Sequence, residues 1–245
     1  MAAAESDRLV TVLRSLPSVP LRVAFLRSYI GDGANADAAL NLDALCAVNR
    51  RETAKEALFA LAFLLSGLAD DPVLDRLGQQ AATQRLENLG RLLRRGALQS
   101  QPPPSKVPEY RADRPLSIGE RRALARRPER RWFEKLLADP EPLVIERLLA
   151  NPRLTEDDVV RLVARRPASV EAQLAVSRTP WLSRGRVRMS LVYNPGTPAA
   201  VAVPLVVLCT QPELSSIVRS HEASEIVRTI ANEILALIVR DRGLR

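Results

Sequence analysis

The segment Val144-Ile145-Glu146-Arg147-Leu148-Leu149-Ala150-Asn151-Pro152 returns, with changes, as Val187-Arg188-Met189-Ser190-Leu191-Val192-Tyr193-Asn194-Pro195. A shift of 43 residues superposes the two, and a Val, a Leu, the Asn and the Pro coincide. With one gap the match continues, and Thr155 aligns with Thr197. A period of this length is typical of α-helical repeats in which two or three helices form one layer. The pattern therefore predicts short stacked helices, each ending at Asn-Pro and followed by a helix that starts at Thr.

Prolines recur through the same part of the chain, at intervals that leave room for about three helical turns and a corner. They are Pro128, Pro140, Pro152, Pro167, Pro180, Pro195 and Pro212. Ser117-Ile118-Gly119-Glu120 opens the region as a capping box. The last predicted helix, at about 224–240, has a broad apolar stripe. It is interpreted as a cap on the final layer, with a dimerisation or partner-binding helix as the alternative. We assign residues 116–245 to a repeat domain with a C-terminal capping helix.

The first part of the chain also has the apolar spacing of helices, interrupted by proline and glycine. Helices are predicted at about 9–16, 20–30, 37–49, 57–68 and 72–95. The second is expected to end at Gly31-Asp32-Gly33 and the fifth at Gly96, where glycine tolerates a left-handed backbone. Asp71 and Pro72 have the arrangement of a helix start. We predict an N-terminal helical domain over residues 1–96 and an all-α protein.

Residues 97–115 separate the two predicted domains. They include Gln101-Pro102-Pro103-Pro104-Ser105-Lys106-Val107-Pro108, which cannot supply the hydrogen bonds of a helix and favours an extended polyproline conformation. The segment is interpreted as a Pro-rich linker. An extended strap lying on the surface of the protein is the alternative, and the sequence does not separate the two.

The Asn-Pro corners resemble those of a known family. Asn151-Pro152 followed by Thr155, and Asn194-Pro195 followed by Thr197-Pro198, look like the corners of the bacterial leucine-rich repeat variant and of related HEAT-like α-solenoids. The resemblance covers residues 128–212. It implies a right-handed stack of helices whose exposed face binds a partner, usually a protein. Some members carry an iron–sulfur cluster on cysteines before the repeats, and this sequence lacks those cysteines.

Composition narrows the class of protein. The 245 residues are 47% hydrophobic, enough for a sizeable core. The longest apolar run, residues 57–69, is shorter than the roughly 20 residues of a membrane-spanning helix and is predicted to be a buried core helix. The first residues show no secretory signal, so a cytoplasmic protein is expected. Cys46 and Cys209 are far apart and are expected to be buried thiols in a reducing compartment. The excess of Arg over Lys, with abundant Ala, is consistent with a GC-rich bacterial genome.

Arginines form the main candidate binding surface, and more than half of the net charge of +8 lies between residues 101 and 135. The candidates there are Arg121, Arg122, Arg126, Arg127, Arg130 and Arg131. A second cluster contains Arg184 and Arg188, with Arg186 between them. Such arginines could bind an acidic protein, neutralise phosphates, or pair with the interleaved Glu120, Glu129 and Glu134 as an ordinary solvated face. Trp132 and Phe133 beside them are interpreted as core residues, with base stacking as the alternative.

Residues that could carry chemistry are scarce. His221 is the only histidine, and its polar neighbours indicate a surface position or a helix start. Glu156-Asp157-Asp158 is interpreted as the acidic first turn of a helix rather than as a metal site. No phosphate-binding glycine motif is present, and we expect no catalytic residue, metal or cofactor. The predicted function is a non-enzymatic protein-interaction scaffold that binds an acidic partner through arginines. A nucleic-acid-binding helical-repeat protein is the alternative.

Overall fold

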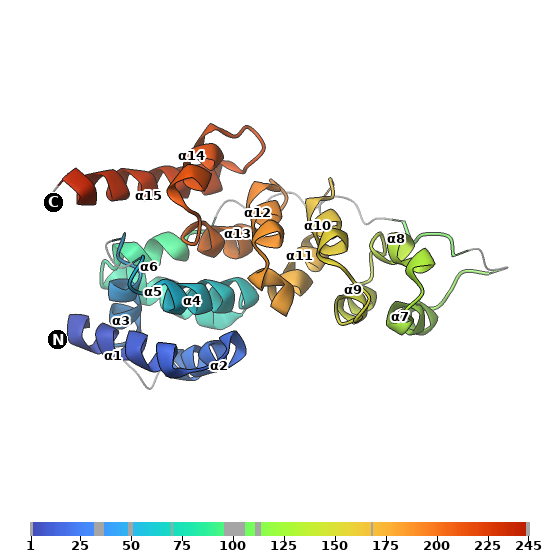
Figure 1. Cartoon of the computed structure of the whole chain (residues 1–245), viewed down its shortest axis with the longest axis horizontal. Helices are drawn as coiled ribbons and strands as arrows, with labels where there is room; N and C mark the ends of the chain where they lie inside the picture. The colour runs from blue at the N-terminus through green and yellow to red at the C-terminus, as the bar shows by residue number, and fades with distance from the viewer. Residues whose placement is uncertain are drawn as a thin grey trace. The chain divides into compact units, whose positions relative to one another are not determined.

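The computed structural model describes residues 2–31, 37–48, 51–69, 71–95, 106–110, 114–167 and 169–243. Helices and connecting turns account for all of these residues, and no strand occurs among them, so the predicted all-α class is confirmed (Figure 1). The expected helix ends at Asp32-Gly33 and Gly96 and the proline run 102–104 lie outside the described residues. No helix in the described ranges is both long enough and apolar enough to cross a membrane.

The helices follow one another in short lengths along the chain. Their bounds are α1 Ala2–Ser15, α2 Val19–Ile30, α3 Ala38–Leu45, α4 Lys55–Gly67, α5 Pro72–Thr83, α6 Glu87–Leu92, α7 Ile118–Arg126, η2 Arg130–Trp132, α8 Phe133–Leu136, α9 Pro142–Leu149, α10 Glu156–Ala164, α11 Val170–Ser177, η3 Pro180–Ser183, α12 Gly185–Tyr193, α13 Ala199–Val206, α14 Gln211–Arg219 and α15 Glu225–Gly243.

The fifth predicted helix is two helices, α5 and α6. Arg85 interrupts it with a φ of 56°, a left-handed backbone that an α-helix cannot contain. The Asp43 carboxylate of α3 then accepts a hydrogen bond of 2.9 Å from the backbone N–H of Leu89, in the first turn of α6. A residue outside the segment therefore supplies the acceptor that starts the second helix, which the local pattern does not show.

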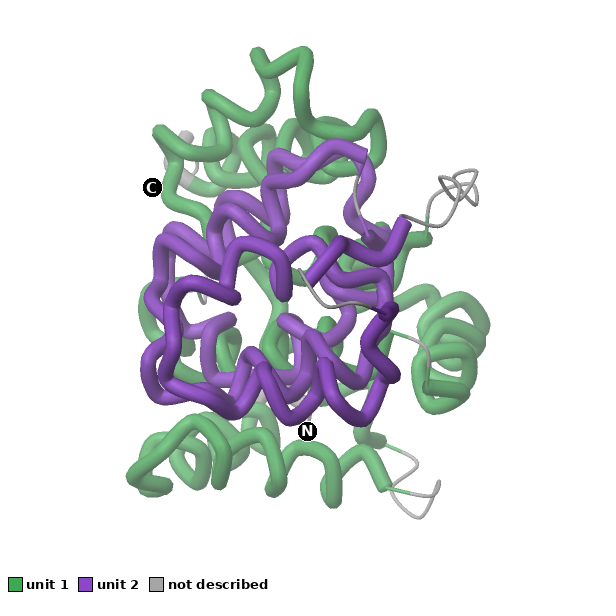
Figure 2. Tube along the Cα trace, turned by 90° about the vertical axis from the view of Figure 1, so that its right-hand side faces the viewer, with its two compact units in different colours: residues 1–97, 199–245 green, residues 98–198 purple. Residues whose placement is uncertain are grey.

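The chain forms two compact units. Unit 1 contains residues 1–97 and 199–245, and unit 2 contains residues 98–198 (Figure 2). The predicted repeat domain at 116–245 is thus divided between them, because α13 packs on α4, α15 packs on α13 and α14, and all three belong to unit 1. The predicted linker at 97–115 supplies the first residues of unit 2.

Unit 1 is built around α4, the apolar run predicted to be a core helix. Leu58, Leu61 and Leu65 are buried there, as predicted. Helices α1, α2 and α13 pack on α4. The buried hydroxyl of Ser66 donates a hydrogen bond of 3.0 Å to the carbonyl oxygen of Val201 in α13. Since α13 is apolar almost all round, it needs cover on more than one side, and α4 and α15 provide it.

The C-terminal helix α15 packs on α13 and α14 within unit 1. Its Glu233 carboxylate pairs with Arg91 of α6 at 3.2 Å and with Arg94, just after α6, at 2.5 Å. These ion pairs link α15 to the end of α6. Val227, Ile230 and Ile234 of its predicted apolar stripe are buried. Helix α15 therefore covers helices of unit 1.

Unit 2 consists of two rows of helices. The first row contains α7, α9 and α11, and the second contains η2–α8, α10 and α12 (Figure 1). Within the rows α7 packs on α9, α9 on α11 and α10 on α12. The predicted capping boxes Ser117–Glu120 and Thr155–Asp158 are both present and start α7 and α10. Thr197 does not cap the following helix, because its hydroxyl is buried without a partner among the described residues.

A repeated hydrogen bond links each helix of unit 2 to the helix before it in the same row. The Asn151 side chain after α9 donates to the Ala125 carbonyl of α7 at 2.7 Å, and Asn194 after α12 donates to the Val163 carbonyl of α10 at 2.7 Å. Arg165 after α10 donates to Leu137 at 2.8 Å. Trp181 after α11 donates to Leu149 at 2.9 Å.

These four acceptors occupy equivalent positions in their helices. Each is the eighth residue counted from the start of its helix, with η2–α8 counted from Arg130 as one helix. Carbonyls in the last turn of a helix have no partner within that helix. Side chains that follow the next helix of the row satisfy them, and these bonds fix the register between successive helices of a row. Asn151 and Asn194 each also accept a hydrogen bond from the backbone N–H two residues later, at 2.9 and 3.0 Å.

Candidate functional site

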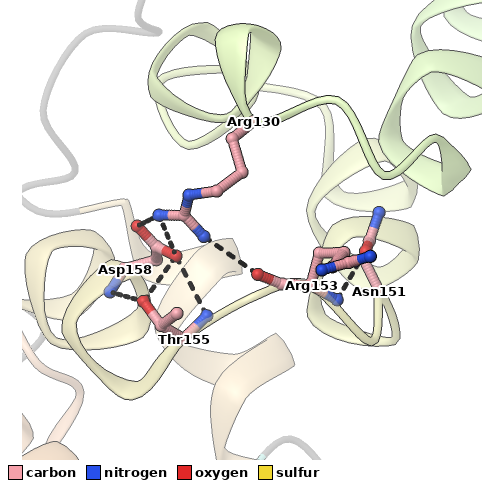
Figure 3. A network of polar contacts seen from close by, with 5 residues as sticks. All are labelled: Arg130, Asn151, Arg153, Thr155 and Asp158. Atoms are coloured by element: carbon pink, nitrogen blue, oxygen red, sulfur yellow. Dashed lines mark hydrogen bonds and ion pairs between the residues drawn. The ribbon is translucent and has the colours of Figure 1, made fainter.

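Arg130, at the start of η2, is held by the next helix of its row (Figure 3). One of its guanidinium nitrogens lies 3.0 Å from both carboxylate oxygens of Asp158, and the other donates to the Arg153 carbonyl oxygen at 2.9 Å. The Arg130 side chain remains 52% exposed, whereas that of Asp158 is 5% exposed. Arg130 is therefore oriented by α10 while part of its guanidinium faces solvent.

Asp158 has two roles in this contact. Its carboxylate accepts hydrogen bonds from the Thr155 backbone N–H at 2.9 Å and from the Thr155 hydroxyl at 2.6 Å, as the capping box requires. Burial by itself raises the pKa of this carboxyl, but the bonds from Thr155 and the charge of Arg130 outweigh burial and hold the pKa below its ordinary value. Asp158 is thus an anionic acceptor shared by a helix start and an arginine.

The neighbouring Asp157 connects the second arginine cluster to the same helix. Its carboxylate pairs with Arg186 of α12 at 2.5 Å, and both side chains are well exposed. The first turn of α10 therefore lies between Arg130 and Arg186, and it brings together two clusters that are far apart in the sequence. We call the surface formed by Arg126, Arg127, Arg130, Arg131, Arg153, Arg184 and Arg186 the arginine edge.

Four members of the arginine edge, Arg126, Arg127, Arg153 and Arg184, are exposed and have no ion pair within the described part of the chain. Arg126 and Arg127 end α7, and Arg184 precedes α12. Cations at the end of a helix are stabilised by its dipole, which explains the first two without a ligand. Arg184 lies at the opposite end of a helix, where the dipole disfavours positive charge and where the first turn of α12 contains no acidic residue.

Other predicted site residues serve the fold. Arg121 is buried and pairs with the fully buried Asp139, so it does not belong to an exposed surface. Arg122 is half-buried, and its Nε has no hydrogen-bond partner among the described residues. Arg188 is half-buried and donates to the carbonyl oxygens of Leu182 and Ser183 at 3.2 and 2.7 Å. The periodicity that places arginines on one helical face does not show these buried partners.

Arg131 and the aromatic pair lie next to each other. Arg131 is 71% exposed, pairs with Glu129 at 2.6 Å, and places its guanidinium carbon 5.0 Å from the centre of the Trp132 ring. Phe133 is buried, so its assignment to the core is confirmed. Trp132 is half-buried and donates from its ring nitrogen to Glu129 at 3.2 Å. Its ring therefore supports Arg131 and is not a fully exposed stacking platform.

Sequence reasoning missed Arg153. Its backbone N–H binds Asn151 and its carbonyl oxygen binds Arg130, which places its exposed side chain on the arginine edge. The available signal was its position two residues after the Asn of an Asn-Pro corner, since that corner brings the following residues back to the preceding helix.

No group of three or more His, Cys, Asp or Glu side chains in the described ranges could together hold a metal ion. His221 is exposed between α14 and α15. Cys46 and Cys209 are buried free thiols, as expected, and burial raises the pKa of the Cys46 thiol, which keeps it protonated.

Comparison of the chain with protein-family models, with curated proteins and with solved structures gave no match.

Proposed function

We propose that this protein is a non-enzymatic interaction scaffold that binds an acidic protein through the arginine edge of a HEAT-like helical stack. The observation that carries the proposal is the position of α10. Its Asp157 and Asp158 hold Arg186 of α12 and Arg130 of η2, so arginines from two separate helices of unit 2 share one border.

The repeated inter-helix hydrogen bonds support the stacked architecture. In a solenoid each repeat contacts its neighbours, and one recurring contact sets the spacing. Side chains after α9, α10, α11 and α12 make such a contact with the helix before them in the row. The right-handed turn of the stack is what the resemblance of the Asn-Pro corners implies.

The distribution of charge favours an acidic protein over nucleic acid. The exposed Asp157 and the partly exposed Glu129 lie between the arginines of the edge. A nucleic-acid backbone presents closely spaced negative charges and would meet these carboxylates as well as the arginines. Acidic side chains on a protein can be spaced so that they meet arginines alone.

The test compares the double variant Arg126→Glu/Arg127→Glu with the matched control Arg161→Glu/Arg219→Glu. All four residues are exposed and have no ion pair within the described ranges, and the control pair, in α10 and at the end of α14, is not among the arginines that define the edge. The probes are fluorescein-labelled polyglutamate and a labelled DNA duplex, with binding followed by anisotropy at several salt concentrations. Arg130 is left unchanged because its loss would also disturb the start of α10.

We expect the wild-type protein and the control to bind polyglutamate, and the edge variant to bind it about ten-fold or more weakly, since two charges are reversed. If both variants bound polyglutamate equally well, the arginine edge would not be the binding site. Tighter binding of the duplex than of polyglutamate, lost in the edge variant and falling steeply with salt, would assign the edge to nucleic acid.

A further inference from the structure

Residues 106–110, the longer of the two described parts of the predicted linker, belong to unit 2 and form an extended segment that we call the strap. Tyr110 is 6% exposed, and its ring centre lies 6.3 Å from that of Trp132. Its hydroxyl donates a hydrogen bond of 2.8 Å to Asp139. Lys135 donates to the carbonyl oxygen of Glu109. Of the two interpretations of the linker, these five residues therefore fit the extended strap on the surface of the protein.

The position of Asp139 in the repeat explains why a strap binds there. Asn151, Arg165 and Asn194 are each the tenth residue from the start of their helices, and each donates to the preceding helix of its row. Asp139 is the tenth residue of η2–α8, the first helix of the second row. No described helix of unit 2 precedes it in that row, and a carboxylate cannot donate. It accepts instead, and the Tyr110 hydroxyl supplies the donor.

Residues outside the strap orient the Asp139 carboxylate and leave one of its oxygens free for a hydroxyl donor. One Asp139 oxygen pairs with Arg121 and accepts from the Glu141 backbone N–H at 3.0 Å, while the other oxygen receives the Tyr110 hydroxyl. Burial and the bond to Asp139 raise the pKa of Tyr110, so the hydroxyl keeps its proton. Arg121 and Glu141 thus orient the acceptor, and the strap occupies its free oxygen.

The strap is anchored mainly by one side chain. Lys106, Val107 and Glu109 are exposed, Pro108 is half-buried, and Tyr110 alone is buried. Segments with few buried apolar contacts open locally at much lower cost than the whole unit. We propose that the surface of η2–α8 around Asp139 is a recognition site for an extended segment carrying a tyrosine, filled here by the protein's own residues 106–110 and exposed when the strap is released. This inference does not depend on the arginine edge.

The test uses the full-length Tyr110→Ala protein, which keeps the site and loses the anchor. Hydrogen exchange is measured at the amides of Leu137, Ala138 and Asp139, which close the last turn of α8. We expect exchange there to be about ten-fold faster than in wild type, as the loss of a charge-assisted hydrogen bond and its aromatic contact implies. Exchange in α4 and α11 should not change. Val107→Ala, which alters an exposed side chain of the same strap, is the matched control.

The second arm adds the pentapeptide Lys-Val-Pro-Glu-Tyr, blocked at both ends, to the Tyr110→Ala protein. We expect saturable return of protection at the three amides and a saturable change in tryptophan fluorescence, because the tyrosine ring lies beside Trp132. The same peptide ending in Phe should bind at least several-fold more weakly, because it lacks the donor for Asp139. If Tyr110→Ala does not fold, Tyr110→Phe replaces it, with the same sign of change expected. Unaltered exchange in the variant, or no response to the tyrosine peptide, would overturn the proposal.

Discussion

The side-chain nitrogen of Asn151 lies 2.7 Å from the carbonyl oxygen of Ala125, and Asn194 makes the same bond to Val163. Each asparagine also donates to a second carbonyl, that of Arg127 at 2.8 Å or of Arg165 at 3.0 Å. One planar amide thus satisfies two carbonyls at the end of a neighbouring helix. Because both asparagines are buried, no water replaces those bonds when the side chain is removed.

Asn151→Ala and Asn194→Ala should each lower the free energy of unfolding by about 1–3 kcal/mol, since each leaves buried carbonyls unpaired. Urea denaturation at neutral pH measures the change. Asn232→Ala, at an exposed position of α15, is the control and should stay within about 0.5 kcal/mol of wild type. A similar loss in all three variants would argue against the inter-helix bond as the source of stability.

Arg121 and Arg126 should behave oppositely although both lie in α7. Arg121→Ala leaves the buried Asp139 carboxylate without its ion-pair partner and should destabilise the protein by about 3–5 kcal/mol. Arg126→Ala removes an exposed side chain and should change stability by less than about 0.5 kcal/mol. Thermal and urea unfolding of the two variants measure the change in the free energy of unfolding. Equal stability of the two variants would contradict the burial of Arg121.

The stability contribution of Asp158 should depend on pH with a definite sign. Its pKa is lower in the folded protein than the ordinary value of 3.8, so its stabilising effect is present above that value and is lost as the pH falls through the folded pKa. The stability difference between wild type and Asp158→Asn should therefore be constant from pH 7 to about pH 5 and shrink below pH 4. A difference that grows on acidification would contradict the contacts with Arg130 and Thr155.

The pKa of the Glu120 carboxyl can be measured directly and tests its contact with Arg114. The hydrogen bonds from Arg114, at 2.6 and 3.0 Å, and from the Ser117 backbone N–H lower the pKa of its carboxyl to about 2. An NMR titration of the side-chain carboxyl carbon should give this value. In Arg114→Ala the pKa should rise toward its ordinary range but stay below it, because the capping box remains. An unchanged pKa in that variant would show that Arg114 is not its main cause.

Local rules predicted much of the secondary structure. The capping boxes at Ser117 and Thr155 and the helix start at Asp71-Pro72 are present as predicted, because a cap acts within one helical turn. The break between α5 and α6 was missed, since the acceptor that starts α6 is Asp43 of another helix. The sequence identified the arginine clusters, but it did not show that Arg121 is buried and that Arg122 and Arg188 are half-buried.

The sequence by itself determined the all-α class, most helix starts, the buried α4 and the Asn-Pro corners. These features depend on periodicity and on residues a few positions apart. Only the tertiary structure decided that residues 199–245 join unit 1, that Asp139 buries Arg121, and that Asp157 and Asp158 hold arginines from two clusters. The physical reason is that exposure and pairing depend on which helix packs against which, and the partners lie eighteen to twenty-nine positions away in the chain.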